Sequence, residues 1–226
     1  MTLLSTENLS KKYGENEAAV TALDQVSFSV EKGEFVSVMG ASGSGKSTLL
    51  NLLGGLDYPT EGKVLYHGNN LFDMNDEELS RFRLKTIGFI FQSYNLIPEL
   101  TVRENIILPA EIAREKPEEE RVAQIVEALG LSDRLAHLPG QISGGQQQRA
   151  AIARALINQP EILLCDEPTG NLDQKSGENV LQLLKMLNLD YGMTILMITH
   201  DAKIAEQTAR TICLSDGKIV NEIQQE

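Results

Sequence analysis

Hydrophobic and polar residues alternate between positions 26 and 30, where Val26, Phe28 and Val30 share one face of a predicted strand. The same kind of analysis predicts a second strand at residues 34–39, which enters a glycine-rich loop, and a helix after that loop at residues 46–53. Two more strands are predicted at residues 62–68 and 86–91. The N-terminal third is therefore predicted to be rich in strands.

The middle of the chain has the pattern of consecutive helices. Thr101, with Glu104 three residues later, forms a capping box that starts a helix running to about residue 113. Pro117 suits the first turn of a second helix, which Gly130 ends. A third helix is expected to begin near Ser143.

The last third returns to alternating elements. Residues 161–166 and 194–199 predict strands, and residues 174–189 predict a helix between them. Asp216 and Gly217 lie between two β-like segments and indicate a type I′ hairpin. Strands alternating with helices predict an α/β fold that has a parallel-sheet core, a helical insertion and some antiparallel strands.

Composition limits the class of protein. The 226 residues, 42% of them hydrophobic, can form one domain or a tight pair of subdomains. No apolar run approaches the roughly 20 residues of a membrane span, and the N-terminus lacks the apolar core of a signal peptide. The net charge of −12 argues against a general nucleic-acid binder. Cys165 and Cys213 lie in apolar runs, which predicts buried, reduced thiols in a cytosolic protein.

One glycine-rich segment fits the phosphate-loop pattern G-x-x-x-x-G-K-[ST]. Glycines let backbone N–H groups approach phosphates, and the following helix N-terminus favours anions. Lys46 would reach the β- and γ-phosphates, and Ser47 would bind Mg²⁺. The pattern predicts nucleotide binding by Gly40, Ala41, Ser42, Gly43, Ser44, Gly45, Lys46 and Ser47.

Two carboxylates end the predicted strand at residues 161–166. Ligands of parallel sheets bind at the carboxyl ends of strands, so Asp166 would face the Mg²⁺ ion through water. Glu167 would polarise the water that attacks the phosphate. The alternative is that the pair only caps the following turn.

Two adjacent glycines open the third middle helix. Ser143 is explained as an ordinary N-cap, but Gly144 and Gly145 each cost a helix about 1 kcal/mol. Their presence indicates a need for bare backbone, for which a second anion site is the natural candidate.

Taken together, these motifs resemble the ATP-binding subunit of an ABC transporter. Residues 142–146 resemble the family signature LSGGQ with Ile in place of Leu, and residues 171–173 resemble the D-loop. Gln92 resembles the Q-loop glutamine, His200 the switch histidine and Tyr13 the aromatic residue that stacks on adenine. The motifs follow the family order over residues 13–200.

The resemblance implies a P-loop NTPase fold with an ABC-type ATPase core, an N-terminal antiparallel β subdomain and a helical insertion. The whole chain, residues 1–226, would be one nucleotide-binding domain with its core at 1–92 and 158–226 and its helical subdomain at 93–157. The implied activity is ATP hydrolysis, and the implied cofactors are ATP and Mg²⁺.

The resemblance also assigns roles to residues. The implied catalytic residues are Glu167, His200 and Lys46. The implied metal ligands are Ser47, Gln92 and Asp166. The residues that would bind ATP together with the phosphate loop are Tyr13, Thr48 and Gln92. Two subunits would close head to tail in an ATP-dependent homodimer. Contacts across it would come from Ser143, Gly144, Gly145, Gln146 and Asp173.

Several stretches resemble the MacB- and LolD-like branch of macrolide, lipoprotein and antimicrobial-peptide exporters. They include the phosphate loop with its helix, residues 87–109, the DEPTGNLD segment and the loop at residues 15–19. This branch implies a separate FtsX-like permease and a peripheral location at the cytoplasmic face of a bacterial membrane. The alternatives are an FtsE-like ATPase controlling cell-wall hydrolysis, a non-transport ABC ATPase and a small-molecule kinase.

The candidate docking site for the permease is an apolar cluster of Tyr94, Leu96, Ile97, Pro98 and Leu100.

Overall fold

The computed structural model describes residues 1–14 and 19–225. They form two compact units: unit 1 is Met1–Ser80 with Gly192–Glu226, and unit 2 is Arg81–Tyr191. The expected loop at residues 15–19 lies, apart from Ala19, outside the described residues. The predicted division into a core and a helical subdomain at 93–157 has different bounds from these units and stays a prediction.

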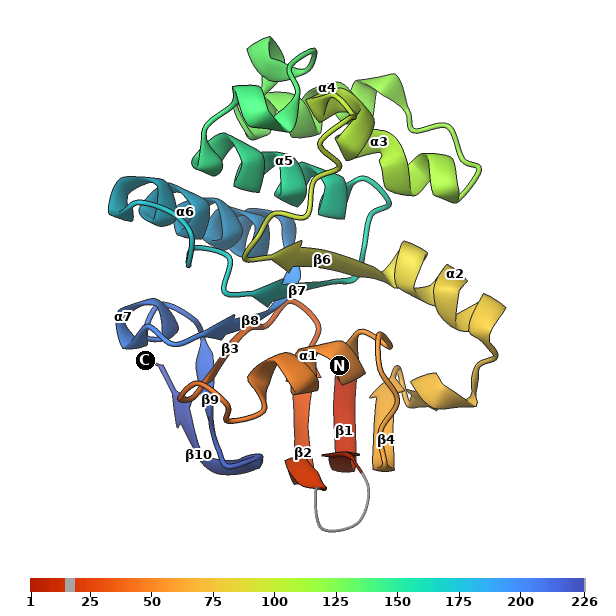
Figure 1. Cartoon of the computed structure of the whole chain (residues 1–226), viewed down its shortest axis with the longest axis vertical. Helices are drawn as coiled ribbons and strands as arrows, with labels where there is room; N and C mark the ends of the chain where they lie inside the picture. The colour runs from red at the N-terminus through yellow and green to blue at the C-terminus, as the bar shows by residue number, and fades with distance from the viewer. Residues whose placement is uncertain (15–18, 226) are drawn as a thin grey trace. The chain divides into compact units, whose positions relative to one another are not determined.

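An antiparallel sheet forms one part of unit 1. Its strands are ordered β2-β1-β4-β5, with bounds Val20–Glu31, Thr2–Tyr13, Glu61–Tyr66 and Asn69–Asn70 (Figure 1). β1 was not predicted, because several register shifts against β2 break the simple alternation of buried and exposed side chains. β4 ends before the predicted residue 68, since His67 and Gly68 turn the chain with φ angles of 50° and 80°.

Parallel strands form the second part of unit 1. β3, Phe35–Met39, pairs in parallel with β8, Thr194–Thr199, and with β9, Arg210–Ser215. β10, Lys218–Gln224, runs antiparallel to β9. Asp216 and Gly217 join them with φ angles of 47° and 75°, which confirms the predicted hairpin and its positive φ angles.

Helix α1, Lys46–Leu53, follows β3 and buries four leucines while it contacts both β2 and β8. It therefore supports the loop before it with core packing. Arg210 ties the two sheets of unit 1 together, because its buried guanidinium group donates to the Ser29 carbonyl of β2 and pairs with Glu34 and Glu222.

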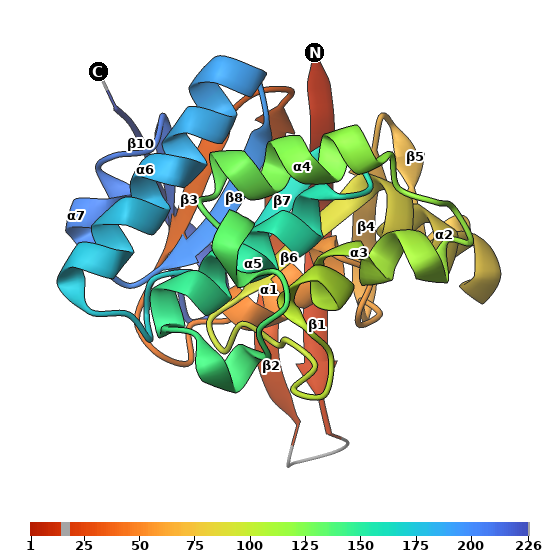
Figure 2. The ribbon, with the colours of Figure 1, turned by 90° about the horizontal axis from the view of Figure 1, so that it is seen from above.

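Unit 2 contains a parallel strand pair and four α-helices (Figure 2). β6, Ile87–Phe91, pairs with β7, Ile162–Asp166. Helix α5, Gly144–Leu156, packs against β6, α3, α4 and α6 and so forms the centre of the unit. The bounds of the other helices are Val102–Ile112 for α3, Glu119–Ala128 for α4 and Gln174–Tyr191 for α6.

One helix boundary and one whole helix differ from the prediction. The capping box of Thr101 and Glu104 is confirmed at the start of α3, but Pro117 lies before α4, which begins at Glu119. Helix α2, Asp76–Thr86, was not predicted, because its polar sequence has no continuous apolar face. Its residues span the end of unit 1 and the beginning of unit 2.

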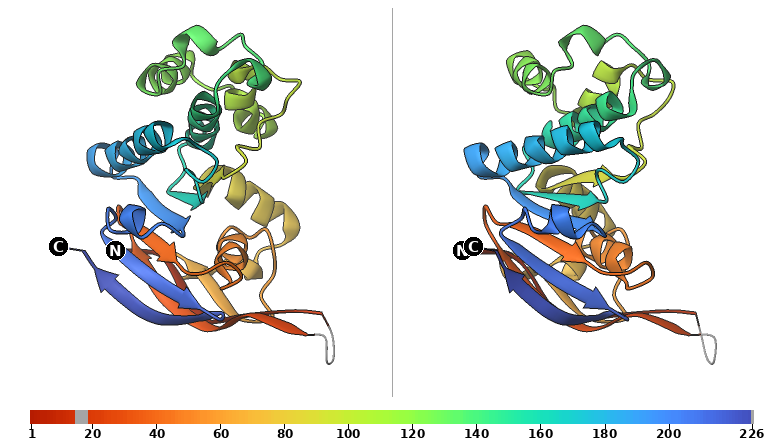
Figure 3. Two further views of the ribbon diagram at one scale, coloured as in Figure 1. Left: turned by 60° about the vertical axis from the view of Figure 1, so that its left-hand side comes forward. Right: turned by 90° about the vertical axis from the view of Figure 1, so that its left-hand side faces the viewer.

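The remaining short elements are helix α7, Ala202–Ala205, seen in unit 1 in Figure 3, and 3-10 helices at Leu71–Asp73, Ser132–Arg134 and Pro139–Gln141. Both cysteines are free thiols, and Cys165 is buried as predicted, whereas Cys213 is only half-buried. Burial, with the nearby Asp166, raises the pKa of the Cys165 thiol. Within residues 1–14 and 19–225, no helix has the length and apolar character needed to cross a membrane.

Candidate functional site

The phosphate loop joins the end of β3 to the start of α1, as the sequence predicts. Gly45 is the N-cap of α1 and has a φ angle of 103°, a left-handed conformation that glycine adopts without strain. A Cβ atom on Gly45 would lie 2.3 Å from the Ala22 carbonyl oxygen, and one on Gly40 would lie 2.2 Å from the Leu214 carbonyl oxygen. The path of the loop therefore requires glycine at both positions.

Two side chains of the loop have polar groups that a bound phosphate could accept hydrogen bonds from. The Lys46 ammonium group is mostly buried and donates to the carbonyl oxygens of Gly40 and Ala41, each at 2.8 Å. The Ser44 hydroxyl oxygen is buried and has no hydrogen-bond partner among the described residues. A cation on neutral carbonyls and an unpaired hydroxyl both gain from a bound anion.

His200 lies next to the phosphate loop in unit 1. β3 and β8 are paired in parallel with Met39 opposite Thr199, so Gly40 and His200 are the first residues after these two strands. The exposed histidine is followed by Asp201, whose carboxylate caps α7 through the Lys203 amide at 2.8 Å. The structure thus places His200 beside Gly40, the residue whose carbonyl accepts from the Lys46 ammonium group.

Tyr13 also lies beside the phosphate-loop helix. It is the last residue of β1, and its hydroxyl donates to the Asp57 carboxylate at 2.7 Å. The Thr48 side chain, in the first turn of α1, lies close enough to this hydroxyl to lower its pKa, against the larger raising effects of burial and Asp57. The ring is 42% exposed, so an aromatic surface is available next to α1.

In unit 2, the predicted acidic and amide residues follow adjacent strand ends. Phe91 of β6 is opposite Asp166 of β7, so Gln92 and Glu167 are the next residues along each strand. Gln92 Nε2 donates to Asn171 Oδ1 at 3.1 Å, and Asn171 Nδ2 donates to the Gln92 carbonyl at 3.1 Å. This reciprocal pair holds the Gln92 side chain and leaves Oε1 as its acceptor atom.

Glu167 has an unusual backbone for its residue type. Its φ angle is 45°, in the left-handed region, and its carbonyl accepts from the Gly170 amide at 3.0 Å. Non-glycine residues rarely adopt this conformation, and such strain is concentrated at functional sites. The bond to Gly170 is that of a turn, so the turn-cap alternative stands beside the predicted role of Glu167 in hydrolysis.

The signature segment lies at the start of α5 and packs against other parts of unit 2. Ser143 caps α5 in a reciprocal capping box with Gln146, as the N-cap interpretation predicts. A Cβ atom on Gly144 would lie 2.8 Å from the Tyr94 hydroxyl, and one on Gly145 would lie 3.1 Å from the Ser176 hydroxyl. Both glycines therefore lie close to side chains of unit 2, and the second anion site stays a prediction.

Asp173 has a local partner as well. Its carboxylate accepts from the Ser176 backbone amide at 3.0 Å at the start of α6. Hydrogen bonds from the Ser176 side chain and backbone hold the pKa of the exposed Asp173 carboxyl below its usual value.

Two residues of unit 2, Arg154 and Asn105, shape this region without having been predicted. Arg154 donates to the carbonyls of Tyr94 and Asn95, which have φ angles of 60° and 50°. Asn105 is fully buried, accepts from the Ile97 amide at 2.7 Å and donates to three carbonyls of residues 97–101. Asn171, which pairs with Gln92, lies in the segment that resembles the D-loop. For Arg154 and Asn105, the only signal in the sequence is a polar residue within a predicted helix.

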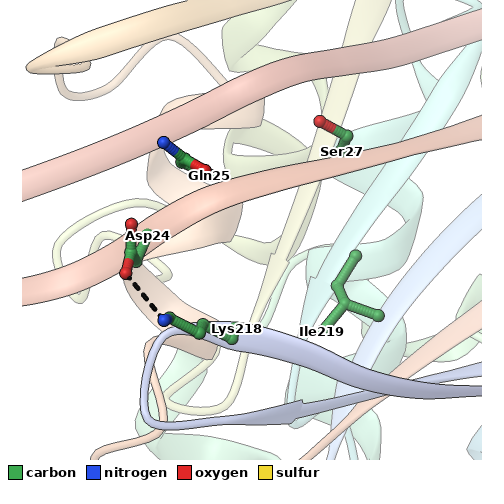
Figure 4. Close-up of a pocket in the computed structure, with 5 residues that line it drawn as sticks. All are labelled: Asp24, Gln25, Ser27, Lys218 and Ile219. Atoms are coloured by element: carbon green, nitrogen blue, oxygen red, sulfur yellow. Dashed lines mark ion pairs between the residues drawn. The ribbon is translucent and has the colours of Figure 1, made fainter.

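A pocket of about 370 Å³ opens on unit 1 (Figure 4). Its lining residues are Asp24, Gln25, Ser27, Lys218 and Ile219, and an ion pair joins Lys218 to Asp24. None of these five residues was predicted as a site residue.

The phosphate loop, the carboxylates after β7 and the α/β fold define a P-loop ATPase of the ABC class. The chain belongs to the ABC transporter family, whose sequence model matches residues 23–170, and it is an ABC transporter ATPase subunit.

The relatives agree with this class. An uncharacterized ABC transporter ATP-binding protein of Methanocaldococcus jannaschii, MJ1508, is 49% identical over 96% of this chain and 98% of its own length. The macrolide export ATP-binding/permease protein MacB of Hyphomonas neptunium is 46% identical over 97% of this chain, which spans 34% of that protein. A dimeric structure of the ATP-binding cassette MJ0796, in a post-hydrolysis state bound to ADP and Pi, has a TM-score of 0.90 and 44% identity and covers 99% of each chain.

Proposed function

We propose that this chain powers a separate FtsX-like or MacB-like permease at the cytoplasmic face of the cell membrane. The proposed task is export of, or resistance to, peptides, macrolides or lipoproteins. The observation that carries this proposal is the 46% identity to MacB along 97% of the chain. The relative MJ1508, matched over 98% of its length, supports an ATP-binding subunit encoded apart from its permease.

ATP would bind first through the phosphate loop. Lys46 would leave its two loop carbonyls for the β- and γ-phosphates, and the buried Ser44 hydroxyl would gain a partner. Backbone amides of residues 40–48 and the N-terminus of α1 would bind the remaining oxygens. Tyr13 would stack on adenine beside Thr48.

Ser47, Gln92 and Asp166 would hold the Mg²⁺ ion. Their hydroxyl, amide and carboxylate oxygens are the donors that this hard cation prefers, which is the fit that supports the assignment. When bound, Mg²⁺ neutralises negative charge on the phosphate oxygens.

Glu167 and His200 would act on the γ-phosphate. Glu167 would orient and polarise the attacking water, and His200 would contact the γ-phosphate oxygens. The strained backbone of Glu167 and the place of His200 directly after β8 support these roles.

A second copy of the chain would complete each site through its signature segment and D-loop, namely Ser143, Gly144, Gly145, Gln146 and Asp173. The dimeric form of the similar cassette MJ0796 supports this arrangement. Local capping is compatible with it, because a serine hydroxyl that accepts from the Gln146 amide still has its own proton to donate to phosphate.

The permease would dock on the apolar cluster of residues 94–100. Ile97 and Pro98 are exposed, whereas Tyr94, Leu96 and Leu100 are half-buried. Asn105 holds the backbone of this segment, so the exposed side chains are presented in a fixed geometry.

Co-purification of the chain with its permease tests the docking proposal. Replacing Leu96 and Ile97 by Asp should abolish complex formation while ATP binding persists. Ile112→Asp is the matched control, since Ile112 is 63% exposed at the end of α3. A double variant that still forms the complex would disprove the docking site.

An FtsE-like role in cell-wall hydrolysis and a non-transport ABC role remain the competing functions. A neighbouring gene for a four-helix permease with a large outer domain would support the MacB-like assignment. Neighbouring genes for cell-wall hydrolases or ribosome factors would support the alternatives.

A further inference from the structure

The side chain of Asp57 connects three groups at the edge of the phosphate-loop helix. Its Oδ2 atom accepts from the Tyr13 hydroxyl at 2.7 Å. Its Oδ1 atom accepts from Lys11 Nζ and from the Tyr58 backbone amide, each at 2.7 Å. Both carboxylate oxygens are thus engaged, and Asp57 is held by the backbone of its own loop.

Lys11 approaches the same tyrosine ring from another direction. It precedes Tyr13 by two residues in β1, and the irregular register of this part of the strand still brings the two side chains together. Lys11 Nζ lies 4.8 Å from the centroid of the Tyr13 ring and also donates to the Tyr58 carbonyl at 2.6 Å. The cation lies over the ring, and Tyr13 as a residue is 42% exposed, so part of its side chain is accessible to a flat ligand.

The protonation states preserve this arrangement near neutral pH. Burial raises the pKa of the Tyr13 hydroxyl, and the hydrogen bond to Asp57 raises it further. Burial opposes ionisation of Asp57, but hydrogen bonds from Lys11 and Tyr13 outweigh it and hold the pKa of the carboxyl below its usual value. Tyr13 therefore remains a donor and Asp57 an acceptor.

We propose that Asp57 is a positioning residue for the nucleotide base, because it orients the Tyr13 ring beside Thr48 of α1 before ATP arrives. The inference rests on the proposed stacking of Tyr13 on adenine. A ring already held by Asp57 and Lys11 loses less conformational freedom on binding than a free one, so the base is bound more tightly.

Affinities for ADP and for inorganic tripolyphosphate, both with Mg²⁺, test the proposal. Tripolyphosphate offers phosphate oxygens without a base. Asp57→Ala should weaken ADP binding about five- to tenfold and leave tripolyphosphate binding unchanged. Tyr13→Phe removes only the Tyr13–Asp57 hydrogen bond, which Asp57→Ala also removes, so it should weaken ADP binding by no more than Asp57→Ala does. The double variant should be no weaker than Asp57→Ala alone, because that bond is already lost.

Asp76→Ala is the matched control. Asp76 accepts from the Tyr58 hydroxyl at 2.9 Å, a similar Asp–Tyr hydrogen bond that does not involve Tyr13. Its ADP affinity should equal that of the unmodified chain.

The outcomes separate the inference from the function on which it rests. If Tyr13→Ala weakens ADP binding but Asp57→Ala does not, the positioning role is wrong and the stacking proposal stands. If Tyr13→Ala has no effect, both fail. Equal losses for ADP and tripolyphosphate in Asp57→Ala would show a general structural role and overturn the proposal.

Discussion

Arg154 of helix α5 donates a hydrogen bond of 2.8 Å to the carbonyl oxygen of Tyr94, which lies 60 positions earlier in the chain. A second bond from the same guanidinium group reaches the Asn95 carbonyl. The signature helix therefore holds the turn that follows the proposed Mg²⁺ ligand Gln92, and the two segments are joined within unit 2.

Arg154→Met should free this turn. Tyr94 and Asn95 have positive φ angles and would lose the bonds that stabilise them. Loss of hydrogen bonds from a charged group should lower the free energy of unfolding by about 2 kcal/mol, measured by urea denaturation. Amide hydrogen exchange at residues 93–97 should accelerate. Arg154→Lys should recover only part of the protection against hydrogen exchange, because lysine lacks the planar guanidinium group that reaches two carbonyls. Unchanged exchange in Arg154→Met would contradict the role of Arg154 in holding this turn.

Lys46→Ala should weaken ATP binding roughly 100-fold, because a charge-assisted contact to phosphate is lost. Isothermal titration calorimetry provides the measurement. Lys116→Ala, at an exposed position between α3 and α4, is the control and should bind normally. Retained affinity in Lys46→Ala would exclude the lysine from phosphate binding.

Glu167→Gln should bind ATP normally but hydrolyse it at least about 100-fold more slowly, the contribution typical of a general base. ATP should then trap a dimer that elutes early in size-exclusion chromatography. Glu161→Gln serves as the control, because Glu161 precedes the opposite end of β7. Normal turnover in Glu167→Gln would remove this residue from the mechanism.

Ser143→Arg should block ATP-dependent dimerisation in the Glu167→Gln background while each monomer still binds nucleotide. The added side chain occupies the proposed contact with the second copy. Ser143→Thr retains a hydroxyl that can cap α5 and should dimerise. Analytical ultracentrifugation with ATP distinguishes the two, and a dimer formed by Ser143→Arg would argue against the signature assignment.

Arg210→Ala should destabilise the chain by about 3 kcal/mol, because it leaves the carboxylate of Glu34 without its buried partner. Lys218→Ala removes the exposed ion pair with Asp24 and should cost less than about 0.5 kcal/mol. Chemical denaturation of both variants measures the difference. Equal losses would contradict the distinction between buried and exposed pairs.

Local features of the sequence were enough for several predictions. The phosphate loop, the Thr101 capping box and the hairpin at Asp216 and Gly217 each depend on a few adjacent residues, whose backbone angles and nearest hydrogen bonds decide the structure. The order of strands and helices likewise followed from hydrophobic patterning. Where that pattern was interrupted, as by the bulges of β1 or the polar sequence of α2, the elements were missed.

Only the tertiary structure decided which distant residues meet. The contact of Gly144 with Tyr94, the clamp of Asn105 on residues 97–101 and the bond from Tyr13 to Asp57 join segments that no local pattern relates. Such pairs form because packing of the core brings their elements together, and the side chains then satisfy buried polar groups. The sequence thus determined the chemistry that is present, and the tertiary structure decided how it is held.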